Sequence, residues 1–199
     1  MPLNSHETIH ISIPEKLPAR FYLTGYMGAG KTTVGKILAR SIHYQFIDTD
    51  RELVKRFKKP MRRIFSEEGE AAFRQAELDL IYELGQEEGL VISTGGGTLV
   101  RDNTLKAALE TGTLIYLKAP VDVLFERVIF SPKDRPMIDV PNAEQVFTDR
   151  FKQREPYYIQ AHIHVDSDRK HPQRVIEQIL EKASQAIKPS QETNPSDPS

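Results

Sequence analysis

Two short segments combine residue types that suit phosphate and metal chemistry. The first, GYMGAGKT at residues 25–32, fits the pattern GxxxxGK(S/T). In that pattern glycine backbone N–H groups surround phosphate oxygens, Lys31 reaches the β- and γ-phosphates, and the Thr32 hydroxyl binds Mg²⁺. The segment follows the apolar run FYLT and precedes TVGKILARSI, whose apolar spacing is helical. This strand–loop–helix context favours nucleotide binding over a chance glycine-rich turn.

The second segment, FIDTD at residues 46–50, ends in two aspartates with one residue between them. In an extended chain Asp48 and Asp50 would point the same way, and such close carboxylates repel unless a cation or hydrogen-bond donor lies between them. We expect Asp48 to complete a Mg²⁺ shell and Asp50 to accept hydrogen bonds from a polyol. Asp50 would equally suit the N-cap of the helix expected from RELVKRF, and both roles are compatible.

A third segment, STGGGTL at residues 93–99, leaves bare backbone that a ligand can approach closely, although glycine runs also form ordinary flexible loops. Arg74, Arg135 and Arg154 stand out by context, Arg135 because SPKDRPMID is typical of a surface loop. Arg154 precedes a proline, which predicts a helix end there. Spacing alone does not separate these three from the other arginines of the chain.

Short β-rich runs alternate with helical stretches between the termini. We expect five strands, at residues 21–24, 45–47, 90–93, 113–117 and 162–165, each with the composition of a buried strand. Helical periodicity is clearest in residues 175–187 and weaker around Phe73, Leu78, Ile81 and Leu84. The alternation predicts an α/β fold of three layers, with helices on both faces of a mostly parallel sheet. In such sheets ligands bind beyond the carboxyl ends of the strands.

Composition restricts the classes of function. The chain has 199 residues, 39% of them hydrophobic, and a formal net charge of −1, so we expect one globular domain and no bulk affinity for nucleic acid or membranes. Without cysteine there are no disulfides, thiolate metal sites or cysteine nucleophiles. No apolar run approaches the ~20 residues of a membrane span. The first residues lack a secretory pattern, and we therefore expect a cytoplasmic protein.

The two ends differ from the centre. Residues 1–19 are polar and proline-containing, which predicts a flexible arm, although IHISI would also suit an edge strand. Residues 188–199 are rich in Pro and Ser, and we expect a disordered tail. The remaining residues, 20–187, would form the domain.

Several motifs together resemble the shikimate kinases. GYMGAGKTTVG, FIDTD, IFSEEGEAAFRQAE, STGGG, RPMI and RFKQREPYY stand in the order and rough spacing of that family across residues 20–187. The resemblance implies a P-loop kinase fold with a mobile lid at about 130–140. It also implies transfer of the ATP γ-phosphoryl group to the 3-hydroxyl of shikimate, in the pathway to chorismate and the aromatic amino acids. KKPMRR is more basic than the corresponding family segment, and RPMI replaces the commoner RPLL.

The resemblance also implies residue roles. Lys31, Asp50 and Arg135 would be catalytic, with Asp50 orienting or deprotonating the attacking hydroxyl. Thr32 and Asp48 would serve Mg²⁺. ATP would contact Gly28, Ala29, Gly30, Lys31, Thr32, Thr33, Arg127 and Arg135, with Arg127 stacking on adenine. Shikimate would contact Asp50, Arg74, Gly95, Gly96, Gly97 and Arg154, with the arginines on its carboxylate.

Two other functions remain open from the sequence. One is another small-molecule P-loop kinase, such as a gluconate or nucleoside monophosphate kinase. The other is a catalytically idle module that binds ligand, which we would expect to lack Lys31, Asp50 or Arg135. We expect ATP and shikimate as the small-molecule partners, and a monomer, because no apolar stripe in the sequence predicts an interface.

Overall fold

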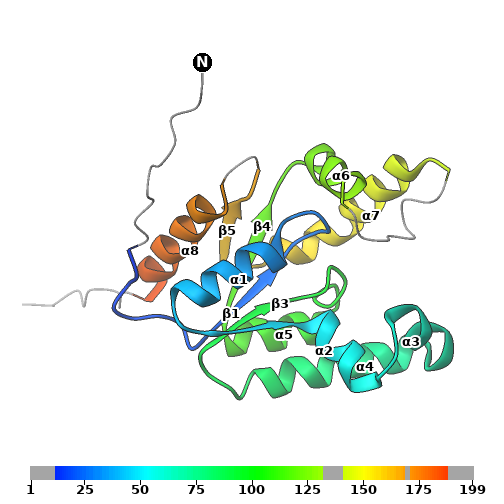
Figure 1. Cartoon of the computed structure of the whole chain (residues 1–199), viewed down its shortest axis with the longest axis horizontal. Helices are drawn as coiled ribbons and strands as arrows, with labels where there is room; N and C mark the ends of the chain where they lie inside the picture. The colour runs from blue at the N-terminus through cyan, green and yellow to red at the C-terminus, as the bar shows by residue number, and fades with distance from the viewer. Residues whose placement is uncertain (1–11, 132–140, 169–170, 188–199) are drawn as a thin grey trace, which may run out of the picture.

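A five-stranded sheet forms the centre of the molecule (Figure 1). The computed structural model describes residues 12–131, 141–168 and 171–187. The strands lie in the order β2-β3-β1-β4-β5 and every neighbouring pair is parallel. Their bounds are β1 (Arg20–Thr24), β2 (Gln45–Asp48), β3 (Leu90–Ser93), β4 (Thr113–Lys118) and β5 (Ile163–Asp166). All five expected strands are present, with ends shifted by at most one residue.

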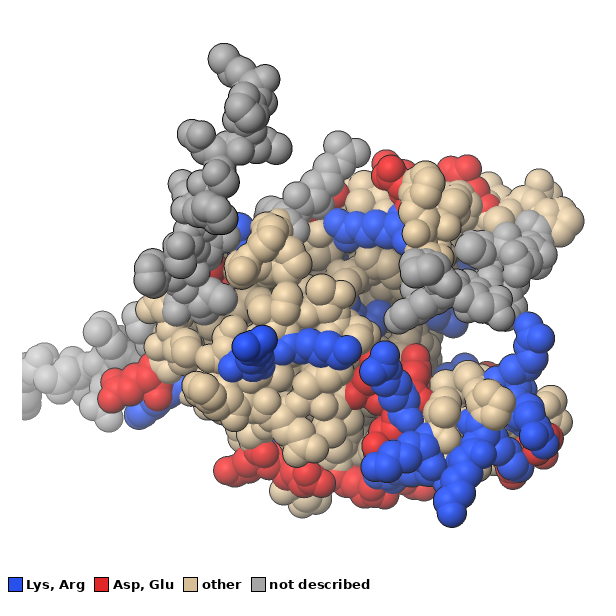
Figure 2. All heavy atoms as spheres, viewed as in Figure 1, with Lys and Arg blue, Asp and Glu red and all other residues tan. Residues whose placement is uncertain are grey.

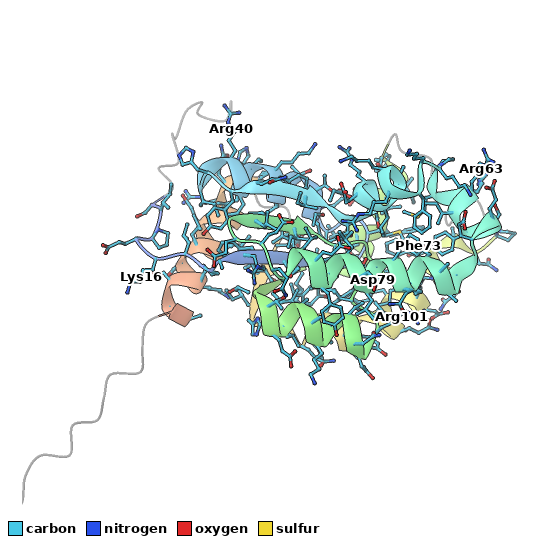
Figure 3. All side chains as sticks on the ribbon, turned by 90° about the horizontal axis from the view of Figure 1, so that it is seen from below. Lys16, Arg40, Arg63, Phe73, Asp79 and Arg101 are labelled. Atoms are coloured by element: carbon cyan, nitrogen blue, oxygen red, sulfur yellow. The ribbon has the colours of Figure 1, made fainter. Side chains whose placement is uncertain are left out.

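Helices cover both faces of the sheet, as the alternating pattern predicts. Figures 1 and 3 show α1 on one face and α4 with α5 on the other, and α8 packs against α1. The helices in the described residues are α1 (Lys31–Ser41), α2 (Thr49–Phe57), α3 (Met61–Glu67), α4 (Gly69–Leu84), α5 (Asp102–Thr111), α6 (Val121–Ile129), α7 (Ala143–Tyr158) and α8 (Pro172–Ile187). The three-layer α/β/α expectation is therefore confirmed.

Burial differs between the central and the edge strands. All residues of β1 and β3 are buried, because neighbouring strands and helical layers enclose them. The edge strand β2 has an exposed Gln45 and only half-buried residues after it, and β5 alternates buried with exposed side chains. The expectation of five buried strands is wrong for these two, because each edge strand has a neighbour on one side only.

The strand order creates a switch point beside β1. From β1 the chain passes through α1 to β2, whereas from the adjacent β3 it passes through α5 to β4 on the opposite side. Connections that leave two neighbouring strands in opposite directions open a crevice at their carboxyl ends. The phosphate loop follows β1 and the triple glycine follows β3. The topology therefore brings these two segments together.

Two helix boundaries differ from the sequence expectation. Helix α7 does not end before Pro156 but continues through it to Tyr158. Proline removes one helical hydrogen bond, but Tyr158 beyond it is buried and hydrogen-bonded, so tertiary contacts hold the last turn in place. Helix α2 begins at Thr49, earlier than RELVKRF suggests, and its N-cap is Asp48 rather than Asp50.

Parts of the chain lie outside the described residues. These are residues 1–11, which contain most of IHISI, residues 132–140, which contain most of the segment expected as a lid, residues 169–170, and the tail at 188–199. Just before β1, Leu17 packs against the core and the Pro18 carbonyl accepts a 3.0 Å hydrogen bond from the Tyr44 hydroxyl. Within the described ranges, no helix combines the length and the apolar character needed to cross a membrane.

Candidate active site

The phosphate loop connects β1 to α1 and packs tightly against β4 and α6. Gly25 and Gly28 have φ angles of 137° and 85°, which side-chain-bearing residues rarely adopt. A Cβ atom on Gly25 would lie 2.7 Å from the Leu117 carbonyl oxygen, and one on Gly28 would lie 2.7 Å from that of Leu124. Glycine at both positions thus lets the loop curl inward against this wall.

The N-terminus of α1 suits an anion. Its N-cap, Gly30, has no side chain to accept hydrogen bonds from the first turn. The first N–H groups of a helix have no acceptor within the helix and therefore suit phosphate oxygens. The Lys31 ammonium group donates to the carbonyl oxygens of Gly25 and Tyr26, at 2.7 and 3.1 Å. These contacts hold the lysine along the inner side of the loop, where it also lines the cavity.

Thr32 and Asp48 meet beside the loop. The Thr32 hydroxyl donates a 3.0 Å hydrogen bond to Asp48 Oδ2, and Asp48 Oδ1 accepts one from the Arg51 backbone N–H. Through the second bond Asp48 caps α2 and turns the chain from strand to helix. The expectation that Asp48 and Asp50 lie on one extended segment is therefore wrong, because Asp48 ends β2 and Asp50 lies in the first turn of α2.

Asp50 nevertheless lines the same cavity as Asp48. A Cβ on Gly95 would collide with Asp50 Oδ1 and would lie 2.8 Å from Thr98 Oγ1, so only glycine leaves room for the carboxylate. The Gly95 N–H donates a 3.0 Å hydrogen bond to the hydroxyl of Thr49, the residue before Asp50. The start of α2 and the triple glycine thus support each other.

The surroundings of Asp50 favour its neutral form. Desolvation by the protein around the carboxyl raises its pKa to about 6, and the nearby charges of Asp48 and Glu77 act in the same direction. Lys31 and Arg74 oppose the shift. The side chain still has solvent access, because it lies in the wall of an open cavity rather than within the core. Asp50 therefore changes charge in the pH range where a proton acceptor works well.

Arg74 and Arg154 converge on the triple glycine from opposite helices. Arg74 comes from α4 and Arg154 from α7, and a Cβ built on Gly97 would lie 3.4 Å from Arg74 Nη1 and 3.6 Å from Arg154 Nη2. Arg154 Nη1 also donates to the Gly96 carbonyl at 3.1 Å, and its guanidinium lies over the Tyr26 ring. Two guanidinium forks that meet at bare backbone suit a carboxylate.

Glu77 belongs to this group, although it was not among the site residues predicted from the sequence. Its carboxylate accepts hydrogen bonds from Arg74 Nη1 and Thr98 Oγ1, both at 2.7 Å, and the residue is only 2% exposed. Glu77 therefore holds the Arg74 guanidinium in place. The sequence does contain a sign of this role, a charged residue within an apolar stripe. Glu77 stands four residues after Phe73 and four before Ile81, on the buried face of α4.

Arg127 contacts the phosphate loop from α6. It donates to the Gly28 carbonyl at 3.3 Å and to the Ser167 carbonyl at 2.8 Å, and it lines the cavity. Arg135 lies outside the described residues, so its place relative to this site is an expectation from the sequence alone.

One cavity of about 700 Å³ connects these groups. Its wall includes the phosphate loop, both aspartates, two of the three glycines and Arg154. The volume is in the range of small-molecule sites. An end that suits phosphate and an end that suits a carboxylate therefore lie in one space, with Asp50 part of its wall.

A family model described as Shikimate kinase matches residues 27–184, well over half of the chain. The chain belongs to the shikimate kinase family. The shikimate kinase of Bacillus cereus (strain AH187) is 38% identical over 164 residues, which cover 82% of this chain and 98% of that protein. That of Chlorobaculum tepidum is 36% identical over 181 residues, covering 87% and 94%.

Solved shikimate kinase structures share the fold. The enzyme from Acinetobacter baumannii, determined in complex with shikimate, matches with a TM-score of 0.76 at 35% identity, covering 84% of this chain and 93% of that one. The enzyme from Aquifex aeolicus matches with a TM-score of 0.74 at 36% identity, covering 84% and 98%. A gluconokinase from Sinorhizobium meliloti reaches 0.59 at 16% identity, over 86% and 95% of the two chains, which shows a common fold alone.

Proposed function

We propose that this chain transfers the γ-phosphoryl group of ATP to the 3-hydroxyl of shikimate, giving shikimate 3-phosphate and ADP. The observation that carries the proposal is the single cavity that Lys31, Asp50 and Arg154 share. Its two ends match the two substrates, because the phosphate loop suits the nucleotide and the paired guanidinium groups suit the carboxylate. Membership of the shikimate kinase family supports the same assignment.

In the reaction, a bond forms between the shikimate oxygen and the γ-phosphorus while the bond from that phosphorus to the β–γ bridging oxygen breaks. Lys31, positioned along the loop, neutralises charge on the transferred group. Asp50 holds the attacking hydroxyl and accepts its proton. Arg74 and Arg154 bind the substrate carboxylate and so orient the ring for in-line attack.

Thr32 and Asp48 are the residues that fit Mg²⁺, since oxygen ligands suit this ion and the two side chains already meet at 3.0 Å. No cluster of three or more His, Cys, Asp or Glu side chains that would suit a metal occurs in the described part of the chain. ATP phosphates and water would therefore provide the remaining ligands. Bound with ATP, the ion supplies charge neutralisation on the β- and γ-phosphates.

We also infer that the enzyme acts as a monomer in the cytoplasm. Each group assigned to the site comes from one chain, and ATP is the phosphoryl donor available in that compartment. Arg127 would border adenine, and Gly28 to Thr33 would hold the phosphates, in keeping with their place at the start of α1.

The test is a coupled assay of ADP release with ATP and Mg²⁺, with shikimate, gluconate or AMP as the acceptor. Gluconate is included because it also combines a carboxylate with hydroxyl groups. Of the three acceptors, we expect only shikimate to give ADP release. A Lys31→Ala protein whose circular dichroism spectrum matches that of the wild type should release no ADP. Turnover of gluconate or AMP without turnover of shikimate would overturn the proposal.

A further inference from the structure

Tyr158 and Arg154 donate hydrogen bonds to the same backbone oxygen. The Tyr158 hydroxyl lies 2.5 Å from the Gly96 carbonyl oxygen, and Arg154 Nη1 lies 3.1 Å from it. The two residues are four positions apart on α7, so their side chains share one face of the helix. Through this shared acceptor the hydroxyl is linked to the guanidinium proposed to bind the shikimate carboxylate.

The surroundings of Tyr158 hold its hydroxyl in place as a donor. The residue is 1% exposed and its ring lies 5.5 Å from that of Tyr116, measured between centroids. Burial raises the pKa of the Tyr158 hydroxyl far above neutrality, so the group keeps its proton at physiological pH. A buried, neutral tyrosine needs an acceptor, and the Gly96 carbonyl provides it.

The acceptor itself would otherwise be poorly restrained. Gly96 stands between two other glycines, and glycine backbone has the greatest conformational freedom of any residue. Rotation of the peptide would move the carbonyl away from Arg154. The guanidinium would then lose the support of this carbonyl, while its contact with the Tyr26 ring, at 5.7 Å from the centroid, would remain.

We propose that Tyr158 is a positioning residue for the shikimate carboxylate: it fixes the Gly96 carbonyl, which in turn holds the Arg154 guanidinium beside Arg74. The inference rests on the proposed function. It also explains why α7 continues through Pro156, because only the turn beyond this proline brings the tyrosine hydroxyl to the loop. Tyr158 itself does not line the cavity; it acts on the cavity wall through Gly96, next to Arg154, so we expect the role to concern the acceptor rather than ATP.

The test is Tyr158→Phe, which removes the hydroxyl and keeps the ring. We expect the KM for shikimate to rise about 5- to 10-fold, as for one lost hydrogen bond, with kcat and the KM for ATP changed less than twofold. Tyr157→Phe is the matched control, because Tyr157 is half-buried and its hydroxyl makes no hydrogen bond within the described residues. Its kinetic constants should equal those of the wild type.

A double-mutant cycle distinguishes positioning from a general packing role. With Arg154 replaced by Ala, Tyr158→Phe should weaken shikimate binding in calorimetry less than twofold further, because the group it positions is gone. Full additivity, a matching rise in both KM values, or unchanged shikimate affinity in Tyr158→Phe would each overturn the inference. If the wild type itself neither binds nor phosphorylates shikimate, the proposed function fails instead.

Discussion

Asp50 shows how one carboxyl can be both unfavourable for stability and suited to catalysis. It stands near the carboxylates of Asp48 and Glu77, and the surrounding protein removes much of its solvation. Each of these effects disfavours the charged form that proton acceptance requires. The cations nearby, Lys31 among them, reduce the penalty without cancelling it. A carboxyl group whose pKa is raised by its surroundings in this way is typical of functional sites.

Asp50→Asn should therefore lower kcat by at least about 100-fold, the range for loss of a general base, while raising stability at neutral pH. The sign follows from the raised pKa: the folded protein binds the proton more tightly, so wild-type stability falls as pH rises from about 4 through 6. The variant should melt above the wild type at pH 7.5, and the difference should disappear near pH 4. Thermal melts at both pH values measure it.

Asp79→Asn is the control, since Asp79 is an exposed carboxylate on α4 that does not line the cavity. It should leave both kcat and the melting temperature unchanged. Equal turnover in Asp50→Asn and the wild type would contradict the assigned role.

At the amino end of the sheet, Arg20 joins β1 to α4 and α5, far from the candidate active site. Arg20, the first residue of β1, donates to the carbonyl oxygens of Glu87, after α4, and Thr111, at the end of α5. Its side chain thus connects the central strand to the C-terminal ends of the two helices that cover one face. The candidate active site lies at the opposite, carboxyl end of the strands.

Arg20→Met should lower the free energy of unfolding by about 2 kcal/mol, because two partly buried carbonyls lose their charged donor. Urea denaturation measures this loss. The kcat should stay within twofold of wild type, given the position of Arg20 at the far end of β1. Arg20→Lys retains the positive charge but not the forked guanidinium group, and it should lower the free energy of unfolding by less than Arg20→Met. A loss below about 0.5 kcal/mol in Arg20→Met would show that solvent replaces these bonds.

Charge is unevenly distributed over the whole molecule despite a net value near zero. Residues 51–63, which form most of α2 and the start of α3, contain seven basic residues and one acid. Figure 2 shows Lys and Arg side chains gathered over these helices. Several pair with glutamates, but Lys58 and Arg62 form no ion pair within the described residues. The first of the basic residues, Arg51, lines the cavity.

This basic surface should favour the approach of two anionic substrates. We expect Lys58→Asn combined with Arg62→Gln to lower kcat/KM for shikimate about two- to threefold at low ionic strength, with kcat unchanged. The difference should vanish near 0.5 M salt because of screening. Asparagine is chosen at position 58 because the backbone there is left-handed, with φ of 52°.

The control is Lys36→Gln with Arg40→Gln on α1. Figure 3 places Arg40 on the opposite side of the molecule from Arg63, which belongs to the basic surface. These two changes remove the same charge and should leave kcat/KM unaltered. An equal loss in both double variants would attribute the effect to net charge rather than to its position.

The sequence by itself determined the positions of the strands and of the phosphate loop, because each depends on neighbours within a few residues. It also indicated the family, through the order of six motifs across residues 20–187. The tertiary structure decided which groups meet. Glu77 was hidden in a helical stripe, Asp48 rather than Asp50 proved to be the cap, and the Tyr158 hydroxyl reached Gly96 beyond a proline expected to end the helix. Such contacts join residues far apart in the chain. They depend on how the helices pack against the sheet, which short-range patterns do not encode.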